Sequence, residues 1–157
     1  PEPIEAFEHE GFGVLVLEYL PSFRTFDDLP EDLAASLAPG LFSNLETMHE
    51  AGLSHGDLRA ENVLVAPDDE GVETLYFIDA TRVRDGAIDD ARAYDIACGL
   101  ASLAPRIGPN AAVEAAAVVY PADDLLAARE FLDFVGMRPD HDFDTASLKG
   151  EIEKLAA

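Results

Sequence analysis

Cysteine, lysine and long apolar runs are all scarce in this 157-residue sequence, and each scarcity excludes a class of protein. Cys98 is the single cysteine, so the chain forms no internal disulfide and no multi-cysteine zinc site. Its apolar helical surroundings predict a small buried side chain. No apolar run approaches the ~18 residues that cross a bilayer, and no basic segment leads into an apolar stretch as in a signal peptide. We therefore expect a cytoplasmic protein without membrane contact.

Positive charge is also scarce. The sequence holds 32 acidic and 10 basic residues, which gives a net charge of −22, and Lys149 and Lys154 are its only lysines. Such a carboxylate surface repels nucleic acids, so no direct nucleic-acid binding is expected. The acids are spread along the whole chain, and their mutual repulsion is screened at molar salt, where the Debye length falls to ~3 Å. The composition therefore favours a halophilic, archaeal protein from a salt-rich cytoplasm.

Hydrophobic residues make up 48% of the chain, and their periodicity predicts the elements of a globular domain. The continuous apolar run over residues 12–20 predicts a buried strand. Leucines at helical spacing predict a long helix from residue 31 to about 52, which Pro39 kinks or splits. Short strands at 63–65 and 75–78 flank a turn-rich segment, which predicts a hairpin. Four more helices are predicted, at about 89–104, 109–119, 122–135 and 145–156.

The sequence HGDLRAEN at residues 55–62 carries the most specific polar motif. It fits the pattern H-x-D-L-x-x-x-N, and Asp79 follows the second strand of the predicted hairpin. Phosphoryl transfer needs a carboxylate facing the acceptor hydroxyl and oxygen ligands for the Mg²⁺ on the nucleotide phosphates. Asp57 can supply the carboxylate, and Asn62 can supply one of the Mg²⁺ ligands. The hairpin then returns the chain so that Asp79 completes the metal site. The spacing therefore predicts an ATP and Mg²⁺ site.

These residues resemble the catalytic loop and metal-binding segment of the protein-kinase-like superfamily. The resemblance is closest to compact atypical branches: RIO-type kinases, small archaeal kinases allied to tRNA modification, lipopolysaccharide kinases and aminoglycoside phosphotransferases. It implies that Asp57 is the catalytic base and that Asn62 and Asp79 hold Mg²⁺. Arg59 stands where serine/threonine kinases carry a lysine that touches the transferred phosphate. A solvated surface arginine is the alternative for this residue.

The segment Leu17-Glu18-Tyr19-Leu20 resembles the kinase hinge. The resemblance implies that the Glu18 carbonyl and the Leu20 amide contact adenine and that Leu17 is the gatekeeper. Residues 1–20 are then the end of the N-lobe with its hinge strand. Residues 21–157 form an α+β kinase-like C-lobe, mainly helical with a small catalytic β-hairpin.

Two further residues are expected to support the catalytic loop. Asp95 resembles the buried acid that braces this loop from below, and a plain surface aspartate is the open alternative. His55 is expected to pack and hydrogen-bond within the loop and to take no part in catalysis.

An acidic run near the C-terminus imitates a calcium-binding loop. Its carboxylates have EF-hand-like spacing, at Asp140, Asp142, Asp144 and Glu151. Thr145 occupies the position at which that loop needs glycine. We therefore expect a plain interhelical loop in which Asp144 caps the last helix, and no metal beyond the Mg²⁺ of the nucleotide.

The segment after Asp79 departs from the kinase pattern. Ala80 and Thr81 replace the usual Phe and Gly, which implies that the phenylalanine switch is absent. Only 15 residues separate Asp79 from Asp95, which leaves no room for a standard activation segment. Gly56 replaces the arginine that pairs with a phosphorylated activation loop. Regulation through such a loop is therefore not expected, and a peptide acceptor is not favoured.

No Gly-rich phosphate loop, V-A-I-K lysine or partner glutamate precedes the hinge in this sequence. We expect these parts in an upstream N-lobe of the parent protein. The favoured function is a kinase that moves the γ-phosphoryl group of ATP to a hydroxyl of a protein or small molecule. Two alternatives stay open. One is a nucleotide-binding regulatory module that transfers nothing, and the other is an ATPase whose hydrolysis remodels a partner.

Overall fold

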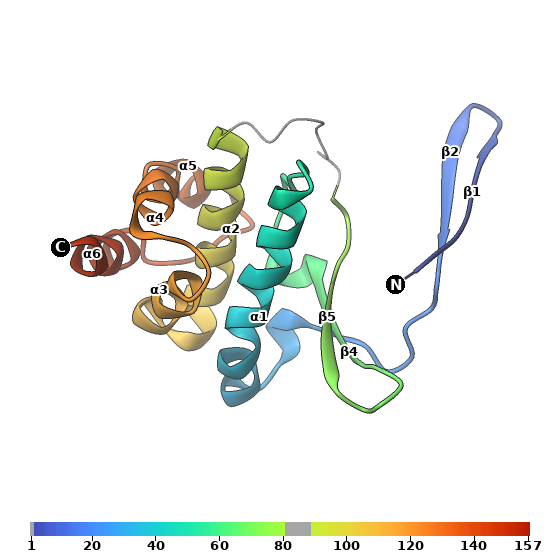
Figure 1. The fold of residues 1–157 in the computed structure, drawn as a ribbon, viewed down its shortest axis with the longest axis horizontal. Helices are drawn as coiled ribbons and strands as arrows, with labels where there is room; N and C mark the ends of the chain where they lie inside the picture. The colour runs from blue at the N-terminus through green and yellow to red at the C-terminus, as the bar shows by residue number, and fades with distance from the viewer. Residues whose placement is uncertain (1, 81–88) are drawn as a thin grey trace.

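The computed structural model describes residues 2–80 and 89–157, which form two small antiparallel sheets and a body of helices (Figure 1). The predicted α+β class, mainly helical with a hairpin, is confirmed. None of the described helices is long and apolar enough to cross a membrane. The elements in chain order are β1 (Pro3–His9), β2 (Phe12–Leu17), β3 (Arg24–Thr25), α1 (Glu31–Glu50), β4 (Val63–Pro67), β5 (Glu73–Phe77), α2 (Asp89–Ile107), α3 (Pro109–Ala117), α4 (Ala122–Arg129), α5 (Leu132–Gly136) and α6 (Thr145–Ala156).

Helix α1 runs unbroken through Pro39, so the proline does not split it. A proline inside a helix costs about 3 kcal/mol because it removes a backbone hydrogen bond. The apolar face of α1 offsets this cost, since Phe42 and Leu45 are fully buried in the main core. Gly52 follows the helix with φ +75° and donates its N–H to the His49 carbonyl at 2.9 Å. The predicted stop at this glycine is confirmed.

Two later helix boundaries differ from the prediction. Helix α2 continues through Pro105 to Ile107 and does not end at residue 104. The proline lies in the last turn, where it removes one hydrogen bond and leaves the buried contacts of Leu100 and Leu103 intact. The single helix predicted over 122–135 is instead two shorter ones, α4 and α5.

The capping predictions are confirmed. Pro109 begins α3 at its first turn. The Asp144 side chain accepts the Ser147 N–H at 3.1 Å and caps α6. Cys98 is fully buried, as its apolar surroundings predicted.

The predicted strand in residues 12–20 is present as β2, but its predicted burial is wrong. Strand β2 pairs with β1 through a turn at Glu10 and Gly11, both with positive φ. Figure 1 shows this ribbon standing apart from the helices. Within the described residues no other element covers it, so large apolar side chains lie exposed: Ile4, Phe7, Phe12, Leu15, Val16 and Leu17.

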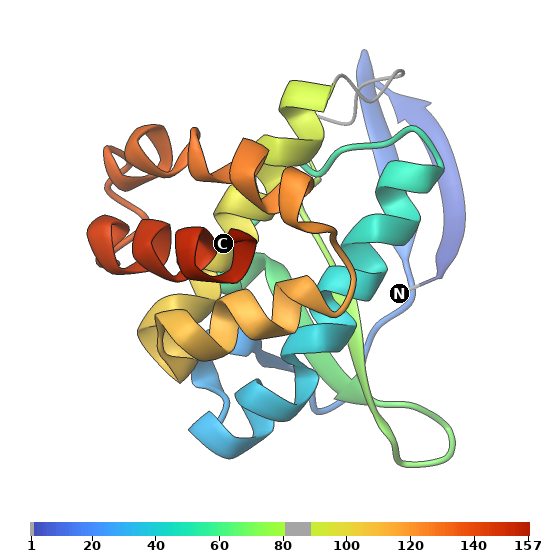
Figure 2. The same cartoon turned by 60° about the vertical axis from the view of Figure 1, so that its left-hand side comes forward.

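The β4–β5 hairpin positions the candidate site. Strand β4 lies between β3 and β5, and β5 contacts α1. The Ile78 N–H donates to the Asn62 carbonyl at 3.0 Å, so the hairpin brings the end of the catalytic loop beside Asp79. Helices α1 and α2 lie side by side (Figure 2).

Candidate active site

Asp95 of α2 holds the catalytic loop in place. Its side chain is fully buried, and its carboxylate accepts the backbone N–H groups of His55 at 2.6 Å and Gly56 at 2.7 Å. Gly56 has φ +76°, a conformation that glycine adopts at little cost. The expectation of a buried brace is confirmed, and the surface alternative for Asp95 is wrong.

A buried chain of hydrogen bonds extends this brace into the helices. His49 of α1 lies with Nε2 3.2 Å from Asp95 Oδ2, and the Tyr120 hydroxyl lies 3.3 Å from His49 Nδ1. His49 Nε2–H donating to the carboxylate and Tyr120 O–H donating to Nδ1 satisfy all three groups. His49 and His55 thus both contact Asp95, His49 through its ring and His55 through its backbone N–H. No local pattern indicated this, because the partners lie 40 or more residues apart.

Replacing Asp95 by asparagine is expected to destabilise the fold by about 3 kcal/mol, because an amide group then faces backbone donors that need an acceptor. Unfolding in urea at high KCl, followed by circular dichroism, measures this. Asp90→Asn is the matched control, since Asp90 is an exposed residue of the same helix. It should change the free energy of unfolding by less than about 0.5 kcal/mol. Equal stability of the two variants would contradict the bracing role.

His55 acts within the loop, as expected. Its ring is buried, with Nε2 3.1 Å from the Ile78 carbonyl and Nδ1 accepting the Asp57 N–H at 3.3 Å. Burial lowers the pKa of His55 below its ordinary value, although Asp95 and other acids act against the shift. A neutral ring that is protonated on Nε2 fits both contacts. His55 therefore ties the loop to the chain entering Asp79.

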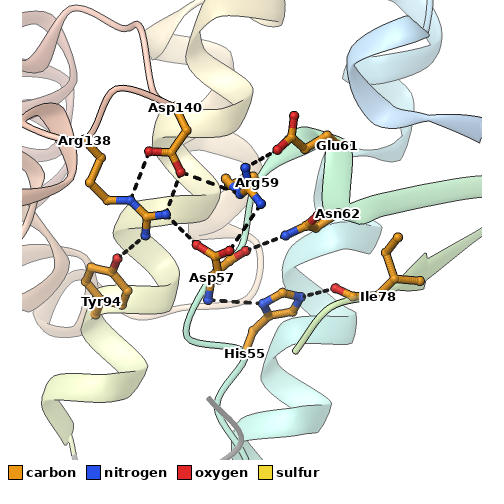
Figure 3. Close-up of polar contacts among 9 residues, drawn as sticks. All are labelled: His55, Asp57, Arg59, Glu61, Asn62, Ile78, Tyr94, Arg138 and Asp140. Atoms are coloured by element: carbon orange, nitrogen blue, oxygen red, sulfur yellow. Dashed lines mark hydrogen bonds and ion pairs between the residues drawn. The ribbon is translucent and has the colours of Figure 1, made fainter. Parts of the chain in front are cut away.

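The Asp57 carboxylate lies between two arginines (Figure 3). Arg138 donates to Oδ1 at 2.5 Å, and Arg59 Nη2 lies 3.3 Å from Oδ2. Burial alone would raise the pKa of Asp57, but the Arg138 hydrogen bond and the charges of both arginines outweigh it and hold the pKa below its ordinary value. Asp57 is therefore an ionised carboxylate at neutral pH.

The Arg59 side chain is 25% exposed, and it pairs with Asp57, Glu61 and Asp140. Contact with a transferred phosphate stays a prediction for this residue, and a surface arginine stays the alternative.

Sequence reasoning missed Arg138 and its partners. Arg138 lies 81 residues from Asp57, just after α5, and also contacts Asp140 and the Tyr94 hydroxyl. The acidic run containing Asp140 signalled only a loop in the sequence. An arginine beside that run was the one available hint, and nothing in the spacing connected it to the catalytic loop.

Asn62 and Asp79 lie on adjoining segments, as the motif predicts. The Asn62 side chain is 3% exposed and donates its Nδ2–H to the Asp57 carbonyl at 2.9 Å, which leaves Oδ1 for a cation. Asp79 is exposed and has φ +56°, an uncommon conformation for a residue other than glycine. Mg²⁺ on a nucleotide needs only one or two protein oxygens besides phosphates and waters. These two residues fit that requirement, and Thr81 lies outside the described residues.

The hinge-like residues 17–20 connect the β1–β2 ribbon to the rest of the described structure. Leu17 ends β2 and is 41% exposed, and Glu18 is exposed. Leu20 is buried in a small apolar cluster with Leu64 and Ala66 of β4. The hinge and the hairpin of the site are thus in direct contact at Leu20.

A cavity of ≈ 240 Å³ opens beside the catalytic loop. Its walls include Arg59 and Glu61 of the loop, Asp140, and Ser102 and Arg106 of α2. Arg59 and Asp140 also belong to the ion-pair cluster around Asp57, so the cavity and the candidate base share these two neighbours.

Comparison with known proteins points to kinases. The model of the lipopolysaccharide kinase (Kdo/WaaP) family matches residues 33–97. A probable myosin light chain kinase of Dictyostelium discoideum is 34% identical over 82 residues, which are 48% of this chain and 21% of that protein. Serine/threonine-protein kinase 1 of African swine fever virus is 25% identical over 88 residues, covering 52% of this chain and 29% of that protein. A probable serine/threonine-protein kinase 2 of Plasmodium falciparum is 37% identical over 68 residues, which cover 40% of this chain and 13% of that protein.

These matches support a protein-kinase-like superfamily. The α+β fold is consistent with a kinase-like C-lobe. The chain spans less than a third of the length of each of these relatives.

Proposed function

We propose that the protein containing this chain is a kinase that moves the γ-phosphoryl group of ATP to a hydroxyl acceptor. The observation that carries this proposal is one short loop, braced by buried Asp95, that presents the ionised Asp57 carboxylate and ends at Asn62, which is hydrogen-bonded to the chain just before Asp79. Within the superfamily we place it in a compact atypical branch, because 15 residues between Asp79 and Asp95 leave no room for a standard activation segment.

Each candidate residue has a distinct role in this proposal. Asp57 orients or deprotonates the acceptor hydroxyl, and Arg59 stabilises the charge that migrates with the phosphoryl group. Asn62 and Asp79 hold Mg²⁺, which when bound neutralises phosphate charge. At the other end, the Glu18 carbonyl and the Leu20 amide read the adenine, with Leu17 as gatekeeper.

We place the acceptor in the cavity beside Arg59. Its wall offers guanidinium donors from Arg59 and Arg106 and carboxylate acceptors from Glu61 and Asp140. A hydroxyl both donates and accepts hydrogen bonds, so this mixed lining suits a hydroxyl-bearing molecule.

Incubating the full-length protein with γ-labelled ATP in molar KCl tests the proposal. Labelled phosphate should move to an acceptor with Mg²⁺ present and stay on ATP with EDTA. ATP binding without transfer or hydrolysis would favour a regulatory module. Hydrolysis without any phosphorylated product would favour an ATPase.

We also propose a halophilic, haloarchaeal setting in the cytoplasm, supported by the net charge of −22. Raising KCl from dilute buffer to molar concentration should then raise the melting temperature, because salt screens repulsion among carboxylates. We expect the melting temperature to rise by about 5 °C or more, which corresponds to a gain of about 1–2 kcal/mol in the free energy of unfolding for a domain of this size. Thermal melts across a KCl series measure the effect. A melting temperature that stays flat or falls would exclude this setting.

A further inference from the structure

Arg138 reaches the candidate base from a distant part of the chain. Arg59 approaches Asp57 from within the catalytic loop, whereas Arg138 follows α5 and lies 81 residues away in sequence. Figure 3 shows the two guanidinium groups on different sides of the carboxylate. Arg138 binds Oδ1 at 2.5 Å and Arg59 lies 3.3 Å from Oδ2, so each carboxylate oxygen has its own cation.

The Arg138 guanidinium is held independently of Asp57. Asp140 binds Nη2 at 2.5 Å, and the Tyr94 hydroxyl of α2 accepts from Nη1 at 2.6 Å. Burial raises the pKa of Tyr94 to about 12, so the hydroxyl stays neutral and can accept this bond. A helix of the main core and the segment around Asp140 therefore fix the arginine, and the arginine then fixes one oxygen of Asp57.

The contacts with Arg138 and Arg59 leave hydrogen-bonding positions of the Asp57 carboxylate open to a substrate. A carboxylate has about four acceptor positions on its two oxygens, and the Arg138 hydrogen bond uses one of them while Arg59 approaches the other oxygen as an ion pair. The remaining positions can meet an acceptor hydroxyl, provided that the carboxylate does not rotate about its Cβ–Cγ bond. Transfer rates depend steeply on such orientation, and small misplacements of a reacting group cost about 10²-fold.

We propose that Arg138 is a positioning residue that orients the Asp57 carboxylate toward the phosphate acceptor. This inference rests on the proposed kinase function. It also gives the segment after α5 a role in the site: a permanent cation for the catalytic loop, which carries Gly56 at the position where kinases use an arginine.

The test compares Arg138→Met with Arg129→Met in the full-length protein. Arg129 is the matched control, because it is an arginine paired with two carboxylates, Glu130 and Glu153, on the surface of α4. Release or transfer of labelled γ-phosphate gives kcat, and calorimetry gives the Kd of Mg·ATP. For Arg138→Met we expect kcat to fall by about 10²-fold with Kd changed less than about twofold. Arg129→Met should change neither.

Partial variants keep the test decisive if Arg138→Met fails to fold. Arg138→Lys retains the charge but not the three-way contact, so an intermediate kcat is expected. Tyr94→Phe removes one anchor and should lower kcat by a few-fold. Adding methylguanidinium to Arg138→Ala should restore part of the lost kcat, which a purely structural role would not allow.

Four outcomes would overturn the inference. Unchanged kcat in Arg138→Met would show that Asp57 is oriented without it, and raised kcat would show that the arginine blocks the base. A loss of Mg·ATP affinity in Arg138→Met as large as its loss of kcat would show that Arg138 acts on nucleotide binding. An inactive wild-type protein would refute the proposed function and this inference with it, whereas an active wild type with an active Arg138→Met refutes this inference alone.

Discussion

Replacing Asp57 by asparagine is expected to lower phosphate transfer by about 10³-fold while leaving Mg·ATP binding nearly unchanged. The amide keeps the size of the side chain and can still accept from Arg138, but it cannot take the proton of the acceptor hydroxyl. Because the proposed role of Asp57 lies with the acceptor and not with the nucleotide, the Kd of ATP should stay within about twofold. Labelled γ-phosphate transfer and calorimetry on the full-length protein measure the two quantities.

Replacing Asp79 by asparagine should weaken Mg·ATP binding, which Asp57→Asn should leave nearly unchanged. A neutral amide is a poor replacement for an anionic Mg²⁺ ligand, so Mg²⁺-dependent ATP binding should weaken by about tenfold or more. Asp69→Asn in the exposed turn between β4 and β5 is the control and should behave as wild type. If Asp57→Asn and Asp79→Asn lose ATP affinity equally, the assignment of base and metal ligand is wrong.

The 157-residue chain by itself is expected to turn over ATP more than about 10³-fold more slowly than its parent protein. In a kinase-like cleft the hinge reads adenine, while a Gly-rich loop and a lysine clamp the phosphates from above. This sequence carries Asp57, Asn62, Asp79 and the hinge but neither part of the upper clamp. Transfer depends mainly on positioning and charge neutralisation, so losing the clamp should cost more than losing one side chain.

Exposed apolar surface on the β1–β2 ribbon supports the proposal of an upstream N-lobe. Ile4 is 67% exposed, Phe12 74% and Leu15 60%. Contiguous apolar side chains on a soluble protein commonly mark a surface that another element covers. The rest of an N-lobe sheet, pairing with the free edges of this ribbon, is the covering we propose.

The comparison is made in high KCl with labelled ATP, using the chain and the full-length protein at equal concentration. We expect at most weak Mg·ATP binding by the chain, and transfer when the upstream residues are present. Robust turnover by the chain would show that the upper clamp is dispensable. A full-length protein that binds ATP without turnover would support the regulatory-module alternative.

The parts of the site that are local in sequence could be predicted. The spacing of Asp57, Asn62 and Asp79 around a hairpin follows from strand periodicity and turn composition, and the structure brings these segments together. The burial of Asp95 could be reached only through the family resemblance, since an acid in an amphipathic helix is equally consistent with the surface.

The contacts made over long sequence distances could not be predicted. Arg138 joins Asp57, and Tyr120 joins His49, only because α1, α2 and the segments after α3 and α5 pack together. An apolar run likewise indicates burial but not the partner, so β2 was expected inside a body that does not cover it. Prolines 39 and 105 fail as helix boundaries because buried neighbours compensate for one lost hydrogen bond.

The uncovered β1–β2 ribbon has a consequence for handling this chain. Both of its strands have an edge unpaired within the described residues, beside aromatic and aliphatic side chains. In dilute buffer the net charge of −22 keeps copies apart. Molar KCl removes that long-range repulsion, and edge-to-edge strand addition between copies becomes favourable. The salt that we expect to stabilise the helical body should therefore also promote self-association through the ribbon. Light scattering of the chain in molar KCl would show whether the ribbon is covered.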